Sequence, residues 1–500
     1  MVTSNALFDL VHAMNKGERK SFRLLANYYS PDKKNHLFLF DLLTKMDHYD
    51  SGFLQQKLAE AAIKTPLWAL STYLQEQILK SLRFSATDKT VDDKIINLTT
   101  NAKILRQKGL EKLSQSNMQK AKKLAIENEK FTLLLEIQNI EWHYRYDFDP
   151  KDISEFGETL QILNSIYAYR NASFEKNTLM WKGEIRDPEL KAEWDRLIST
   201  PLFDSKTDRK YYEEQYHYLQ ILMRYYFRNS QFAQSLHYQQ KTVEHLESNP
   251  NLLSGYKETY MFELNGMVGS LCQNHKNDLA AEALSKLIHF GNDQLSESEL
   301  VRKVDTVLVA YANLIFSYLR DHLFQEANQV SIEAKKFLAT HPATEAHKAF
   351  LYLNFTKISI YNGDFNEALK WNNKIRNAEI KQRDDFNTWS KLFNLIIHFE
   401  LRNFELIKSI THSTAVHLEK RKQLYKTEAI ILKYLKKEFP KASSNGETMQ
   451  LLKLMRDELI EVRKDPYEAK AYDYFDYIMW LESKIKRRSL IDLAADSNND

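Results

Sequence analysis

Very few side chains in this sequence have the types and spacing that chemistry on a substrate or a metal requires. Cys272 is the only cysteine, so neither a disulfide framework nor a cysteine metal site is expected. A lone thiol within a helical pattern is usually a small buried apolar group. His412 and His417 lie five residues apart and so would not share the face of a helix around a metal ion. With neither a glycine-rich phosphate loop nor a His-Glu-x-x-His pair, we expect no enzyme, no metal and no cofactor.

Two basic residues near the end of a predicted helix suggest binding of nucleic acid as an alternative. The segments 52–62 and 66–84 have the lengths of a helix-turn-helix pair, and Lys80 and Arg83 in the second helix could meet phosphates. However, that helix begins with Pro-Leu-Trp, whereas a recognition helix reads bases with polar residues near its amino end. Binding of DNA by residues 1–90 therefore rests on fold analogy alone.

The composition is typical of a folded helical protein. Hydrophobic residues make up 43% and charged residues 27% of the chain, and the formal net charge is only +3. Glycine and proline are scarce, at 11 and 9 residues, whereas sheets need turn residues at short intervals. No run approaches the ~18 apolar residues of a membrane span, and residues 1–17 lack the apolar core of a signal peptide. We expect an all-α, cytoplasmic protein without membrane contact.

The clearest structural signal is a corner between two antiparallel helices at residues 360–371. Gly363 can adopt the left-handed conformation that ends a helix, because it has no Cβ atom. Asp364 can cap the next helix with its side-chain oxygen. Phe365 and Ala368 then share one face of that helix, so a large residue stands beside a small one and the first helix can pack closely.

The corner recurs in weaker form, which predicts an array of helical hairpins. Its proposed anchors are spaced by 39 to 48 residues and are Phe232, Ala280, Phe324, Phe365 and Phe404. Three of the anchors are followed three residues later by a small residue, namely Ser235, Ala327 and Ala368. Ala280 fits only if the frame is shifted so that Ala283 is its small partner, and Phe404 has Ile407 at that position.

The pattern divides the chain into four parts. We expect a small N-terminal helical unit, a long repeat region, capping helices that include a continuous helix over 467–487, and a disordered tail. Their predicted boundaries are 1–90, 91–440, 441–488 and 489–500.

The corner at Gly363 resembles the tetratricopeptide repeat, whose second helix opens Gly-Asp-Tyr/Phe-x-x-Ala-Leu. Upstream, Phe355-Thr356 stands where that family usually has Leu-Gly, and Ser359 replaces the usual tyrosine. The segments Leu7–Lys16 and Trp480–Lys484 also resemble an uncharacterised family of helical-repeat proteins from Bacteroidetes. The first resemblance covers roughly 208–420 and implies antiparallel hairpins stacked as a right-handed α-solenoid.

In tetratricopeptide arrays the first helix of each hairpin lines a concave groove that holds an extended peptide. By that resemblance, the groove would carry Arg224, Asn313, Asn354 and Lys357. An asparagine can pair with a peptide backbone, and a lysine or arginine can bind a carboxylate. We therefore expect a non-enzymatic scaffold that binds a protein, as a peptide or a partner helix, in this groove. The alternative is a transcriptional regulator in which residues 1–90 bind DNA and the repeats act as a sensor.

Overall fold

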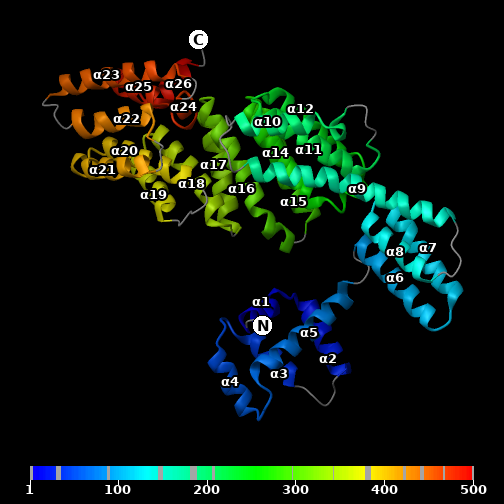
Figure 1. Cartoon of the computed structure of the whole chain (residues 1–500). Helices are drawn as coiled ribbons and strands as arrows, with labels where there is room; N and C mark the ends of the chain where they lie inside the picture. Colours follow the sequence, from blue (N-terminus) through cyan, green and yellow to red (C-terminus); the bar gives the residue numbers. More distant parts are fainter. Residues whose placement is uncertain are drawn as a thin grey trace. The chain divides into compact units, whose positions relative to one another are not determined.

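The fold was analysed in a computed structural model of the chain (Figure 1). The structure describes residues 4–29, 35–86, 90–144, 150–180, 188–204, 209–295, 297–341, 343–377, 384–420, 424–439, 444–465 and 468–497. These residues form helices and no strand, which confirms the predicted all-α class. None of the described helices combines the length and the apolar character that crossing a bilayer requires. Contacts divide the chain into two compact units, unit 1 (Met1–Ser165) and unit 2 (Ile166–Asp500).

Unit 1 is built around the long helix α5 (Leu67–Ala86). Leu70, Leu74 and Ile78 recur at steps of four and are all buried, because side chains at that spacing share one face. Helices α1, α2, α3 and α4 pack against α5 or against each other, and α6, α7 and α8 form a second group. These helices are α1 (Ser4–Ala13), α2 (Lys16–Tyr29), α3 (Asn35–Lys45), α4 (Ser51–Glu60), α6 (Val91–Gln107), α7 (Glu111–Glu127) and α8 (Phe131–Tyr144), followed by α9 (Pro150–Met180), whose second half belongs to unit 2.

Unit 2 contains successive antiparallel hairpins, in which each first helix also contacts the first helix of a neighbouring hairpin (Figure 1). The five hairpins are α11 (Tyr212–Arg228) with α12 (Phe232–Glu247), α14 (Lys257–Gln273) with α15 (Asn277–Gln294), α16 (Glu297–Arg320) with α17 (Phe324–Thr340), α18 (Glu345–Tyr361) with α19 (Phe365–Asn377), and α20 (Asp384–Glu400) with α21 (Phe404–Lys420). The other elements are α10 (Pro188–Ile198), η1 (Pro201–Phe203), α13 (Pro250–Leu253), α22 (Lys426–Lys433), η2 (Tyr434–Glu438), α23 (Asn445–Arg463), α24 (Lys470–Tyr474), α25 (Tyr477–Lys486) and α26 (Leu490–Ser497).

The corner at Gly363 has the predicted geometry. Gly363 adopts a φ of 75°, and the N–H of Asp364 donates to the carbonyl of Ser359 at 2.9 Å, which closes the end of α18. The side chain of Asp364 accepts the N–H of Glu367 at 3.0 Å and so caps α19. Ala368 is fully buried, as close packing of the two helices requires. In unit 2 the same left-handed turn recurs at the corners of the other four hairpins, at residues that carry a Cβ atom, namely Ser230, His275, His322 and Arg402.

The predicted anchor at Ala280 is wrong, and the structure shows the correct register. Helix α15 begins at Asn277, two residues after the left-handed His275, just as α19 begins two residues after Gly363. Ala280 is therefore the small buried residue of this hairpin and not its large anchor. Asn277 stands where the other corners have phenylalanine, and its amide donates to Asp321 at 2.7 Å. A polar residue thus holds this corner by hydrogen bonding, which an apolar pattern does not reveal.

The carboxyl end differs from the sequence expectation in two places. The predicted helix over 467–487 is interrupted at Phe475, which is extended, and Asp476 then caps α25 by accepting the N–H of Met479 at 2.9 Å. The expected disordered tail from residue 489 instead begins with α26, whose Leu490 and Leu493 are buried in the core of unit 2. Residues 441–443 and 498–500 lie outside the described residues, and the other predicted boundaries stay predictions.

Candidate functional site

Two of the predicted groove residues, Asn354 and Lys357, lie inside unit 2. The amide of Asn354 donates to the carbonyl of Ala312 at 2.9 Å, which ties α18 to α16. Lys357 is 1% exposed, and its ammonium group lies 4.4 Å from the centroid of the Phe316 ring. Neither side chain is on a surface that a peptide could reach in this structure, so the expected placement of these two residues on an open groove is wrong.

The face that these residues share is covered by the chain itself. The ring of Tyr474 in α24 stacks on Trp389 in α20 at 4.4 Å and meets Phe316 in α16 at 5.5 Å. Phe475 lies 5.6 Å from Tyr361 in α18, measured between ring centroids. The segment from α24 to Phe475 therefore crosses the first helices of three successive hairpins. A carboxyl-terminal segment thus occupies the face on which the resemblance places a bound peptide.

Arg224 also lies inside unit 2, in a hydrogen-bonded polar network. Its guanidinium donates to Ser173 at 2.8 Å and to Gln220 at 3.0 Å, and Gln220 in turn donates to the carboxyl group of Glu263 at 2.7 Å. Tyr216 donates to the other oxygen of Glu263 at 2.8 Å. Burial raises the pKa of Glu263 and lowers the pKa of Arg224.

This network joins α9, α11 and α14, and nothing in the sequence analysis pointed to its acidic member, Glu263. The only local signal is Gly266, because a Cβ atom there would lie 3.1 Å from Oε1 of Gln239. The Nε2 atom of the same side chain donates to Glu263 at 3.0 Å. A buried and hydrogen-bonded network of this kind orients helices. Asn313 in α16 is half-buried and lies beside Gly269, and its role in binding stays a prediction.

Cys272, which the sequence offered for chemistry, and two buried histidines lie in surroundings that disfavour their charged forms. Cys272 is buried in α14, and burial raises the pKa of its thiol to about 12, so the thiol stays protonated at neutral pH. His398 and His245 have lowered pKa values, because burial disfavours the charged imidazole. The described residues contain no cluster of three or more His, Cys, Asp or Glu side chains that could hold a metal ion.

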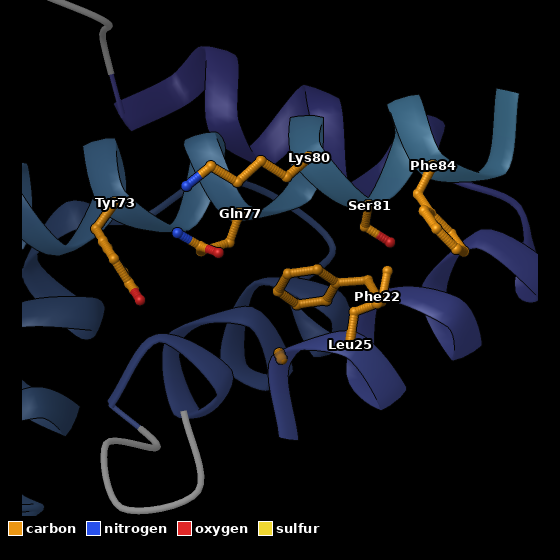
Figure 2. Close-up of a pocket in the computed structure, with 8 residues that line it drawn as sticks. Phe22, Leu25, Tyr73, Gln77, Lys80, Ser81 and Phe84 are labelled. Atoms are coloured by element: carbon orange, nitrogen blue, oxygen red, sulfur yellow. The ribbon is translucent and has the colours of Figure 1, made fainter. Parts of the chain in front are cut away.

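The two basic residues of the nucleic-acid alternative lie on the surface of unit 1. Lys80 and Arg83 are exposed on α5. Lys80 borders a cavity of about 550 Å³ between α2 and α5, and its side chain extends over Gln77 and away from Phe84 (Figure 2). Binding of DNA at these positions stays a prediction.

An apolar stripe on α9 is the most extended candidate for contact with a partner in unit 1. Ile153 and Leu160 lie seven residues apart and are 50% and 44% exposed, and Phe156 and Leu163 between and beside them are half-buried. This spacing places all four on one face, as in the seam of a coiled coil. Trp142 in α8 is exposed next to them, 5.8 Å from Phe156 between ring centroids. We call these five residues the α8–α9 surface.

The side of α9 next to the stripe is fixed to the rest of unit 1. Glu155 accepts a hydrogen bond from Lys122 in α7 at 2.6 Å, and its backbone carbonyl accepts one from Gln138 in α8 at 3.4 Å. Thr159 is buried on the same side. The stripe therefore borders the side of α9 that packs on α7 and α8.

Comparison of the chain with models of protein families, with curated proteins and with solved structures finds no match.

Proposed function

We propose that the chain is a non-enzymatic scaffold that binds a partner protein, and that a helix of the partner packs on the α8–α9 surface. The observation that carries this proposal is the apolar stripe of Ile153, Phe156, Leu160 and Leu163, in which Ile153 and Leu160 are exposed. Apolar side chains at this spacing are unfavourable when exposed to water, but they pack well against a second helix. The stripe agrees with the kind of partner expected from the sequence, although it lies in unit 1 and not in the hairpin groove.

The distribution of apolar surface supports the same choice of unit. Among the described residues, more than half of the exposed large apolar side chains lie in unit 1, which holds only about a third of the chain. Contiguous exposed apolar surface is typical of protein interaction sites. In unit 2, by contrast, the face suggested by the tetratricopeptide resemblance is covered by α24 and Phe475.

The proposal also covers the fold type of unit 2 and the cellular location of the protein. The five recurring left-handed corners and the contacts between successive first helices support the interpretation of unit 2 as a right-handed, tetratricopeptide-like solenoid. A cytoplasmic location, expected from the sequence, is part of the same proposal.

Site-specific photocrosslinking tests this function. A photoreactive amino acid replaces Leu160 in the full-length protein, and as a matched control it replaces Ile332, which is 41% exposed on α17 in unit 2. After illumination in the native cell, we expect an adduct of defined mass at Leu160 that is absent at Ile332. The absence of any adduct at Leu160, or the same adducts at both positions, would contradict the proposal.

A further inference from the structure

The cavity between α2 and α5 in unit 1 has features of a small-molecule site that is separate from the α8–α9 surface. Its volume of about 550 Å³ lies within the range of ligand pockets, which are roughly 300–1,000 Å³. The apolar part of its wall consists of Phe22, Leu25, Ala26 and Phe84, and Figure 2 shows the rings and the leucine gathered at one end. Phe84 is 73% exposed, so the mouth of the cavity presents an apolar surface to water.

The polar lining of the cavity comes from α5. Gln77 and Ser81 are four residues apart and therefore share a face of that helix, and Lys80 extends along it over Gln77 (Figure 2). Gln77, Lys80 and Ser81 each offer hydrogen-bond donors. Lys80 is the only charged group among the described residues that line the cavity. No described acidic side chain pairs with it, so its positive charge is available to a ligand.

A buried hydroxyl without a partner points to a ligand at this position. Ser81 is 2% exposed, and its Oγ has no hydrogen-bond partner among the described residues. A buried polar atom without a partner destabilises the folded state, so native proteins nearly always satisfy such atoms. Figure 2 shows this oxygen directed toward the space beside Phe22. An acceptor atom of a bound molecule would satisfy it.

We propose that this cavity binds a small monocarboxylate with an apolar body. The carboxylate accepts a hydrogen bond from Ser81, and the exposed side chain of Lys80, which extends away from Ser81 in Figure 2, turns toward the carboxylate on binding. The apolar body packs against Phe22 and Phe84. The positive charge of Lys80 favours a negatively charged headgroup, and the unpartnered hydroxyl of Ser81 favours a headgroup with an acceptor atom. The volume of the cavity limits the ligand to a small molecule.

The test uses the full-length protein and isothermal titration calorimetry with octanoate as the probe. Octylammonium and octanol are the matched controls, because they keep the tail and change only the headgroup. We expect octanoate to bind more tightly than both, and each methylene added from hexanoate to decanoate to tighten binding about fourfold. Octanoate that fails to bind, or that binds no more tightly than octanol, would overturn the proposal.

Two variants, Lys80→Gln and Ser81→Ala, assign the binding to this cavity. Lys80→Gln should weaken octanoate binding about two- to fivefold, as expected for a partly exposed ion pair, and leave octanol binding unchanged. Lys64→Gln, at an exposed lysine of the same unit that does not line the cavity, should have no effect. Equal affinities for octanoate in wild type and Lys80→Gln would contradict the assignment.

The second variant, Ser81→Ala, separates binding from structure. Because the hydroxyl has no protein partner, its removal should leave the melting temperature unchanged or raise it. Octanoate binding should weaken about two- to tenfold, since one hydrogen bond is lost. A lower melting temperature with unchanged affinity would show a structural role for Ser81 and overturn this part of the proposal.

Discussion

Glu428 in α22 should make the carboxyl-terminal part of unit 2 less stable as pH rises. Its side chain is buried, and its Oε2 atom has no hydrogen-bond partner among the described residues. The pKa of Glu428 is raised from 4.5 to about 7, because burial and the neighbouring Glu468 disfavour its charged form more than backbone hydrogen bonds favour it. The folded state therefore keeps a proton at pH values where the unfolded state has already lost it.

The size and the pH range of the effect follow from these two pKa values. A folded-state pKa of about 7 against an ordinary value of 4.5 corresponds to about 3 kcal/mol. Because the folded pKa is the higher one, this stability is fully present below pH 4.5 and is lost as pH rises toward 7. Glu428→Gln mimics the protonated carboxyl group and cannot ionise. The variant should therefore gain about 2 to 3 kcal/mol over wild type between pH 5 and pH 8.

Hydrogen–deuterium exchange resolved by peptides is the suitable assay, because it reports the local stability of α22 and α25 in a chain with two units. Wild type and Glu428→Gln are compared at matched pH, so the intrinsic pH dependence of exchange cancels. At pH 8 the slowest amides of these helices should exchange about 100-fold more slowly in the variant, and at pH 5 the ratio should fall to a few-fold. Glu419→Gln, at an exposed position on α21, is the control. A ratio that is the same at both pH values would refute the reasoning.

Three further predictions concern single features of unit 2. Glu468 accepts hydrogen bonds from the N–H groups of Lys426 and Thr427 at 2.9 and 3.1 Å, so Glu468→Ala should destabilise α22 by about 1–3 kcal/mol, measured as faster exchange of its amides. Arg402 has a φ of 58°, so Arg402→Gly should relieve backbone strain and raise the free energy of unfolding by up to about 1 kcal/mol in urea, and a loss of stability would contradict this. Cys272 should react with a thiol reagent at pH 8 only as fast as α14 opens. Rapid labelling of the folded protein would contradict the burial of this thiol.

The sequence predicts the hairpin corners well where an apolar residue or a glycine marks them. Gly363 and Phe365 combine a left-handed residue with a large helix start, and the structure has both in the predicted places. The corner at His275 could not be found in this way, because its left-handed residue carries a Cβ atom and its helix starts with the polar Asn277. Local pattern therefore identified Ala280, the small buried residue, in place of the true start.

The candidate sites were harder to predict than the hairpins, because they depend on contacts between distant segments. Lys357 has the residue type of a surface clamp, and only the fold shows that Tyr474 and Phe475 come to cover its helix, more than a hundred residues later in the chain. The stripe on α9 could have been found from the seven-residue spacing of Ile153 and Leu160. That spacing alone does not show which side of the helix is exposed, since a buried face has the same period.

The most direct test of the central claim is a comparison of two double variants of the full-length protein. Ile153→Glu with Leu160→Glu places two charges on the α8–α9 surface, and Ile332→Glu with Val416→Glu does the same at exposed positions of unit 2. The measured quantity is the affinity for the partner that crosslinks at Leu160. We expect this affinity to fall more than about tenfold in the first variant and to equal that of wild type in the second. Both should melt as wild type does, because all four side chains are exposed. Unchanged affinity in the first variant, with its fold intact, would contradict the account.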